Sequence, residues 1–294
     1  MSRTFSFRSK AGALVRDINA RVEAKSRSHR YDLVWIDKGV YLWPRTVVSL
    51  RQRAGRLVHY TPDTAFHANR SRHFRASAEL FDLLVTTKAF ELEHYETLVP
   101  RDRVLLTTQA YDSRVHMPSA VGARKEPVVT FIGLSEAYRR RCIESLLSAG
   151  ITVRLGGQGW KRFRKRHKGN GRLEFLGERI FGDDYAAHYS AASVGLGLLS
   201  RRFPELHTTR TFEIPACGTV LATEKTADTR QFFTGREAVF FNSFQDLVRR
   251  IRALMADPAR MEELARNGRR RVLADGRDCE SVLRRVLERV GLPC

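Results

Sequence analysis

The sequence predicts an α/β protein made of two doubly wound parallel sheets that face each other across a cleft. Three observations carry this prediction. Segments of helical and strand periodicity alternate along the chain, and a segment without periodicity interrupts the alternation near its middle. The 294 residues also suffice for two domains of about 150 residues each. Helices that alternate with short strands are typical of βαβ units and therefore of parallel sheets.

The first half of the chain opens with a helix, in which Leu14, Ile18 and Val22 recur at helical spacing. A short apolar run at 31–36 follows and predicts the first strand. The alternation then continues with helices at 44–53, 75–81 and 89–98 and strands at 56–60, 83–86 and 104–106.

A linker is expected over 111–127, where proline and glycine replace periodicity. Beyond it we predict strands at 127–132, 151–155, 173–176, 194–199, 220–223 and 238–242, and helices at 137–149, 184–192, 209–216 and from 244 onward. The expected domains are 1–118 and 119–275. The remaining residues, 276–294, form a helix that could pack back on the first domain.

Composition points to an intracellular protein with an excess of positive charge. Lys and Arg number 52 against 32 Asp and Glu, which gives a net charge of +20. The chain lacks an apolar run long enough for a membrane span or a secretory signal, and its four cysteines lack C-x-x-C spacing. We therefore expect a cytoplasmic protein with reduced thiols.

The basic residues cluster between Lys161 and Arg172, where no acidic residue occurs. Such a block attracts polyanions, which makes peripheral contact with an anionic membrane or polymer one interpretation. A solvated basic loop is the other interpretation. No recognised nucleic-acid-binding motif is present, so no specific nucleic acid is expected as a partner.

The segment PELHTTRTFEIPACGTVLATE at 204–224 carries the most informative motif. Glu205 and Glu213 stand eight residues apart with Arg210 between them, and an Ala-Cys-Gly turn follows. This segment resembles the donor domain of nucleotide-sugar-dependent glycosyltransferases of the GT-B fold, which has two Rossmann-like domains. More narrowly, it is similar to the spore-maturation CgeB-like branch, whose R-x-F-E-x-x-A-x-G motif matches Arg210, Phe212, Glu213, Ala216 and Gly218.

The resemblance implies roles that agree with the chemistry of these side chains. Glu213 would accept hydrogen bonds from the ribose hydroxyls of the donor nucleotide, and Arg210 would offset the charge of the leaving diphosphate. Glu205 would face the transferred sugar. A glutamate near a helix start can also serve only as a partner of the helix dipole.

Other segments resemble the family in the same order along the chain, over roughly 31–275. Gly133 and Leu134 match the loop that opens the donor domain, where the glycine would let backbone amides approach a phosphate. The GGQGW segment, with Gly157, Gly159 and Trp160, resembles a turn beside the nucleotide base.

On the acceptor side, Asp63 and His67 follow a predicted strand and would face the cleft, to position the acceptor or to act as general base. Asp63 after Pro62 also fits ordinary turn chemistry. Family members begin with a strand and a glycine-rich loop, whereas this chain begins with a helix, so the first domain is expected to lack the usual first βα unit.

The combined expectation is a glycosyltransferase that moves a sugar from a nucleotide diphosphate sugar to an acceptor, which could be a polysaccharide, a lipid-linked molecule or a protein. No D-x-D triplet occurs, so no metal and no cofactor beyond the donor are expected. The resemblance favours retention of the anomeric configuration. The alternatives are a non-catalytic polyanion binder on a transferase scaffold and a sugar-nucleotide epimerase.

Overall fold

The computed structural model describes residues 9–119 and 125–293, which form two compact units. One unit holds the described residues up to Thr108 and those from Val282 onward, and the other runs from Gln109 to Ser281. The boundary precedes the expected one at residue 118, because the backbone of Tyr111 bonds to Arg277 and Cys279 of the second unit. Part of the expected linker, 120–124, lies outside the described residues.

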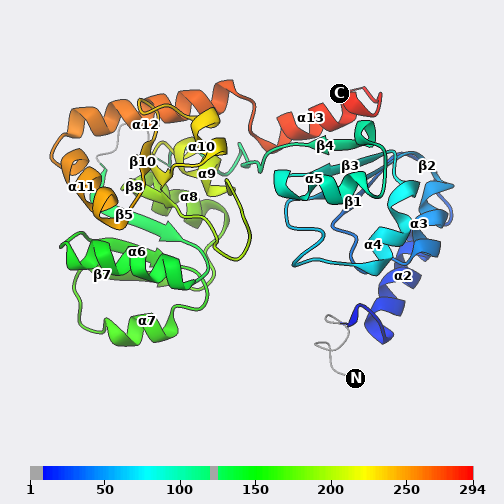
Figure 1. Ribbon diagram of the computed structural model, residues 1–294, viewed down its shortest axis with the longest axis horizontal. Helices are drawn as coiled ribbons and strands as arrows, with labels where there is room; N and C mark the ends of the chain where they lie inside the picture. The colour runs from blue at the N-terminus through cyan, green and yellow to red at the C-terminus, as the bar shows by residue number, and fades with distance from the viewer. Residues whose placement is uncertain (1–8, 120–124, 294) are drawn as a thin grey trace. The chain divides into compact units, whose positions relative to one another are not determined.

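The first unit contains a four-stranded parallel sheet with the order β1-β2-β3-β4 (Figure 1). Its elements follow the predicted alternation. They are α2 (Ala13–Ser26), β1 (Tyr31–Asp37), α3 (Pro44–Arg51), β2 (Ala54–Thr61), α4 (Arg72–Ser77), β3 (Leu83–Thr86), α5 (Leu92–Glu96) and β4 (Val104–Leu106), with 3₁₀ turns at Ala78–Leu80, Ala89–Glu91 and Arg101–Arg103.

The two faces of the first sheet are covered by different parts of the chain. Leu57 and Leu84 pack in one cluster with side chains of α3, α4 and α5. Val58 and Val85 point to the opposite face, since neighbouring strand residues alternate, and there they pack against α13 (Cys279–Arg289). The described strands follow chain order without reversal, so right-handed connections would leave this face bare. The C-terminal helix covers it.

The second unit contains a six-stranded parallel sheet with the order β10-β9-β8-β5-β6-β7. This order reverses between β8 and β5, as a doubly wound sheet requires, and confirms the prediction for this half of the chain. Its strands are β5 (Glu126–Ile132), β6 (Val153–Gly156), β7 (Leu173–Gly177), β8 (Ala192–Gly197), β9 (Val220–Glu224) and β10 (Val239–Phe241). Its helices are α6 (Ala137–Ser148), α7 (Lys161–Arg166), α8 (Gly182–Ala191), α9 (Arg210–Ala216), α10 (Ala227–Phe232), α11 (Phe244–Met255) and α12 (Pro258–Ala274).

Two short helices of this unit were not predicted. The basic segment, for which a solvated loop was one of two interpretations, forms α7, because Phe163 anchors it in the core at 2% exposure while its charged side chains stay exposed. Helix α10 begins at a capping box in which Thr226 and Thr229 satisfy each other's backbone N–H groups. No described helix has the length and apolarity that a membrane crossing needs.

Candidate functional site

A cavity of about 490 Å³ opens beside the carboxyl ends of β5, β6 and β7 in the second unit. This position, next to the reversal of strand order, is where open parallel sheets bind ligands. The residues that line it come from loops and helix starts. They are His116, Ile132, Gly133, Leu134, Gly157, Gln158, Glu178, Ile180, Phe181, Gly182, Tyr185, Thr209, Arg210 and Glu213.

Gly133 and Gly157 supply space on one wall of this cavity. A Cβ atom at Gly133 would lie 2.9 Å from the Phe131 ring and 3.5 Å from Arg210 Nη1. Gly157 has a φ of +110°, and a Cβ there would collide with the Gly133 carbonyl. The Gly133 amide donates to Gly156 O at 2.9 Å, so this amide is already used and does not serve as a phosphate donor.

Arg210 is the most unusual polar group of the cavity. Its Nε is buried without a hydrogen-bond partner, and the guanidinium forms no hydrogen bond or ion pair with a described residue. Instead the guanidinium lies 5.6 Å from the centre of the Phe131 ring. Because an unsatisfied buried donor costs about 1–3 kcal/mol, Arg210 is poised for an anion that enters the cavity.

Glu213 lies one helical turn after Arg210 on α9, is bonded by the hydroxyl of Tyr185 and lies near the ring of His116. The Tyr185 hydroxyl on α8 donates to Glu213 Oε2 at 2.5 Å, and His116 Nε2 lies 3.8 Å from Oε1. Burial and the Glu213 charge raise the pKa of Tyr185 well above its usual value, so its hydroxyl stays protonated and donates. The carboxylate keeps lone pairs that can accept bonds from a ligand.

A second arginine lies next to the cavity and is paired with a carboxylate, Arg139 Nη1 being 3.2 Å from Glu136 Oε1. Arg139 on α6 is buried and donates to the carbonyls of Leu134 and Leu198, each at 3.2 Å. Burial, followed by the charge of Arg210, lowers its pKa to about 10. Glu205, predicted to face the sugar, interacts electrostatically with Arg139 and does not line the cavity.

Two residues predicted to contact the donor lie elsewhere. Trp160 is fully buried among Phe131 and Phe163, and its Nε1 donates to Gly133 O at 2.8 Å. An indole that packs well in the core is unavailable to a ligand, so Trp160 supports the Gly133 loop instead. Gly159 has a φ of +83° and closes the same turn behind Ser135, outside the lining of the cavity.

The predicted acceptor residues Asp63 and His67 lie on the loop after β2 in the first unit. Asp63 pairs with Lys38 Nζ at 2.5 Å, and His67 Nδ1 lies 2.8 Å from Glu91 Oε1. Glu91 is fully buried and accepts the backbone N–H groups of Ala65 and Phe66. This carboxylate therefore orders the loop on which both predicted residues stand.

Comparison with known families places the chain. Residues 139–288, just over half of the chain and including α9 with Arg210 and Glu213, match a family described as glycosyl transferase-like. The chain belongs to this glycosyl transferase-like family. No curated protein matches its sequence.

Solved structures similar to this glycosyl transferase-like protein share its fold at low sequence identity. Sucrose-phosphate synthase from Thermosynechococcus elongatus is 20% identical with a TM-score of 0.66, over 98% of this chain and 79% of that one. Anabaena HepE in complex with UDP-glucose is 15% identical with a TM-score of 0.66, over 95% and 84%. A glycosyltransferase from Rickettsia africae ESF-5 is 10% identical with a TM-score of 0.64, over 94% and 79%. These matches confirm the predicted two-sheet α/β fold of GT-B glycosyltransferases.

Sequence reasoning missed several groups of this glycosyl transferase-like site. Tyr185 and His116 are absent from the predicted site residues. Their contacts with Glu213 join three separate parts of the chain, so no local spacing signals them. Glu91 was missed because a lone glutamate in a short turn resembles a surface residue.

Metal binding was expected to be absent from the glycosyl transferase-like chain. Within 9–119 and 125–293, no group of three or more His, Cys, Asp or Glu side chains is arranged to hold a metal ion. The metal-independent mechanism stays a prediction.

Proposed function

We propose that the protein is a nucleotide-sugar glycosyltransferase that binds its donor in the Arg210 cavity. The observation that carries the proposal is the Arg210 guanidinium, whose buried Nε has no partner among the described residues and which lies one helical turn from a carboxylate bonded by Tyr185. Membership of the glycosyl transferase-like family supports it. HepE, of the same fold, has been solved with UDP and with UDP-glucose, which favours a uridine diphosphate sugar as donor.

Each side chain then has a defined task. Glu213 accepts hydrogen bonds from the ribose hydroxyls, and Arg210 binds the diphosphate with its planar fork. The negative charge on the diphosphate grows as the sugar departs, so Arg210 stabilises the transition state more than the ground state. In this mechanism Arg210 supplies the positive charge that a metal ion would otherwise supply to the leaving diphosphate.

The acceptor belongs to the first unit in this proposal. Asp63 and His67 position it or remove its proton, with Glu91 holding the His67 ring. Glu205 acts on the donor side through Arg139. The E-x(7)-E spacing of Glu205 and Glu213 favours a reaction that retains the anomeric configuration. The acceptor class, whether polysaccharide, lipid-linked molecule or protein, is left to experiment.

We further propose that the chain belongs to the CgeB-like branch. The motif of this branch combines the donor residues Arg210 and Glu213 with Gly218, whose φ of +72° ends α9. Phe212 and Ala216 of the motif are buried, which explains their apolar character.

A donor-turnover assay tests the proposal. The protein is incubated with EDTA and a panel of labelled UDP-, GDP-, ADP- and dTDP-sugars, with polysaccharide, lipid and protein fractions as acceptors. We expect transfer from one donor, strongly reduced in Arg210→Gln. Conversion of the donor into another sugar nucleotide without acceptor would replace the proposal by an epimerase, and no turnover of any donor would contradict it.

A second candidate function rests on helix α7. The basic side chains of Lys161, Arg162, Arg164, Lys165, Arg166, Lys168 and Arg172 are all exposed. This surface fits an anionic membrane or polymer. Vesicles of phosphatidylserine should bind the protein in a strongly salt-dependent way, and replacing Lys161, Arg162 and Lys165 by Gln should abolish that binding. Unchanged binding in this triple variant would remove the candidate.

A further inference from the structure

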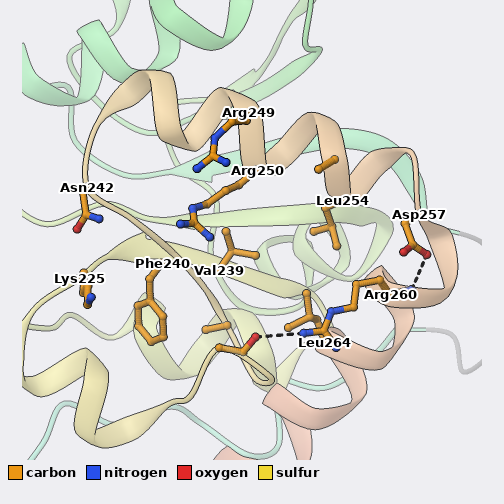
Figure 2. Close-up of a pocket in the computed structure, with 13 residues that line it drawn as sticks. Lys225, Val239, Phe240, Asn242, Arg249, Arg250, Leu254, Asp257, Arg260 and Leu264 are labelled. Atoms are coloured by element: carbon orange, nitrogen blue, oxygen red, sulfur yellow. Dashed lines mark hydrogen bonds between the residues drawn. The ribbon is translucent and has the colours of Figure 1, made fainter.

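A second cavity of about 550 Å³ lies in the same unit, at the edge of the sheet (Figure 2). It is bounded by the edge strand β10, by the start of the β9–α10 loop, and by α11 and α12. It shares no lining residue with the Arg210 cavity, and the proposed transfer reaction makes no use of it. Its volume is typical of a site for a small molecule.

One wall of this edge cavity is apolar. Val239 of β10 is partly exposed on it, and Leu254 and Leu264 of the same core cluster continue it at 5% and 4% exposure. Phe240 packs against the other cluster, on the opposite side of β10, and its partly exposed ring offers a separate flat surface for the organic part of a ligand. Figure 2 shows the Phe240 ring near Lys225, below the guanidinium groups of Arg249 and Arg250.

The other wall carries positive charge that its acidic neighbours only partly balance. Arg249 Nη2 and Arg250 Nε both bond to the carboxylate of Asp246, at 2.6 and 2.9 Å. Lys225 lies at the same end of the cavity and forms no ion pair with a described residue, so this end holds three cations, two of which share the Asp246 carboxylate. At the opposite end, Arg260 pairs with Glu263 at 2.5 Å. The excess of positive charge is therefore confined to the end near Phe240.

Several hydrogen-bond donors at this cationic end have no partner among the described residues. They are Lys225 Nζ, the Asn242 side-chain amide and the two terminal nitrogens of Arg250. Figure 2 shows these groups coming from three segments, with Lys225 and Asn242 on one side and Arg250 reaching down from α11. Such a set matches the several acceptor oxygens of a phosphate group.

We propose that this edge cavity is a second ligand site that takes a phosphate monoester. The phosphate binds Lys225, Asn242 and Arg250, and the organic part lies against the ring of Phe240. A phosphate fits this end better than a carboxylate, because it brings three terminal oxygens to donors on three segments and carries more charge. The proposal stands independently of the function assigned to the Arg210 cavity.

Calorimetric titration with phenyl phosphate tests the site, because this probe combines a phosphate with an aromatic ring. We expect saturable binding that weakens at least tenfold in the double variant Lys225→Gln/Arg250→Gln. Arg266→Gln is the matched control, since Arg266 is exposed on α12 and pairs with Glu262 away from the cavity. Thermal unfolding of each variant reports whether the fold is intact.

Two further measurements define which ligand the edge cavity takes. Phe240→Ala should weaken phenyl phosphate binding while leaving inorganic phosphate binding unchanged. Vesicles of phosphatidic acid distinguish the source of the phosphate, with Lys161, Arg162 and Lys165 replaced by Gln so that α7 does not contribute. Vesicle binding that is lost when Lys225→Gln/Arg250→Gln is added assigns a lipid headgroup, and vesicle binding that is absent or kept assigns a soluble ester. The proposal is overturned if phenyl phosphate fails to bind, or if its affinity falls in Arg210→Gln but not in the double variant.

Discussion

The hydroxyl of Tyr185 lies 2.5 Å from Oε2 of Glu213 and donates a hydrogen bond to it. Tyr185 stands on α8 and Glu213 on α9, and both line the same cavity. The bond fixes one carboxylate oxygen and leaves the other, which is 3.8 Å from His116 Nε2, at the cavity surface. The hydrogen bond from Tyr185 thus fixes the orientation of the Glu213 carboxylate at the cavity wall before a ligand binds.

Removal of this bond should weaken nucleotide binding. In Tyr185→Phe the carboxylate loses its fixed orientation, and a hydrogen bond to a charged group contributes about 1.5–3 kcal/mol. We expect UDP affinity to fall by roughly tenfold or more, measured by calorimetry. Tyr31→Phe, which removes an exposed hydroxyl from β1, should bind UDP as the native protein does. Equal affinities in both variants would show that Tyr185 does not position Glu213.

Arg210 should recognise the diphosphate and not the nucleoside. In Arg210→Gln we expect UDP affinity to fall by a hundredfold or more, about 3 kcal/mol, while the weak affinity for uridine stays the same. Arg210→Lys should recover only part of the loss, because an ammonium group lacks the planar fork. A parallel loss of uridine binding would place Arg210 at the base instead.

Any side chain at position 133 should weaken donor binding. In Gly133→Ala the new Cβ would lie 2.9 Å from the Phe131 ring, so the ring must shift, and Arg210 packs over that ring. We expect at least tenfold weaker UDP binding, with a modest fall in stability of about 1 kcal/mol. Gly171→Ala is the matched control, because nothing lies within 4 Å of a Cβ there. The same UDP affinity in both variants would contradict this account.

Protonation of His59 should destabilise the first unit at mildly acidic pH. His59 is buried beside Phe74, its Nε2 bonds to Lys38 O at 3.0 Å, and burial lowers its pKa from 6.5 to about 4. The unfolded chain therefore takes up a proton between pH 6.5 and 4 that the folded chain refuses. The free energy of unfolding should fall by about 3 kcal/mol as pH decreases through this window.

Chemical denaturation at several pH values measures this contribution. His59→Phe fits the aromatic surroundings of the site and removes the titrating group. Its free energy of unfolding should depend less on pH between 6.5 and 4 than that of the native protein. An identical pH dependence in the two proteins would rule out His59 as the cause.

Much of the fold follows from local pattern. The strands at 83–86 and 104–106 were predicted with the bounds that they have, and the other strands differ by one or two residues at an end, because buried parallel strands are short apolar runs with polar ends. Helix α7 was missed because its sequence is almost wholly basic and only Phe163 contacts the core. The strand order in the first sheet and the packing of α13 on it depend on contacts between distant segments.

Part of the candidate site could also be predicted from the sequence. Gly133, Leu134, Gly157, Arg210 and Glu213 were predicted from the motif and line one cavity. Trp160 was predicted beside the nucleotide base but lies in the core, outside the lining of the cavity. The sequence does not distinguish a tryptophan that faces a ligand from one that faces the core when it follows a glycine turn. Tyr185 and His116 reach Glu213 only through the tertiary fold, and the roles of all these residues stay predictions.

The most direct test of the central claim is calorimetric titration with UDP, GDP, ADP and dTDP, in EDTA and at two salt concentrations, on the native protein and on Glu213→Gln. We predict saturable binding of one nucleotide, UDP in the first place, that persists at the higher salt concentration and is lost in Glu213→Gln. Weak binding that is indifferent to the base, vanishes with salt and is unchanged in Glu213→Gln would contradict the assignment of the Arg210 cavity to a nucleotide-sugar donor.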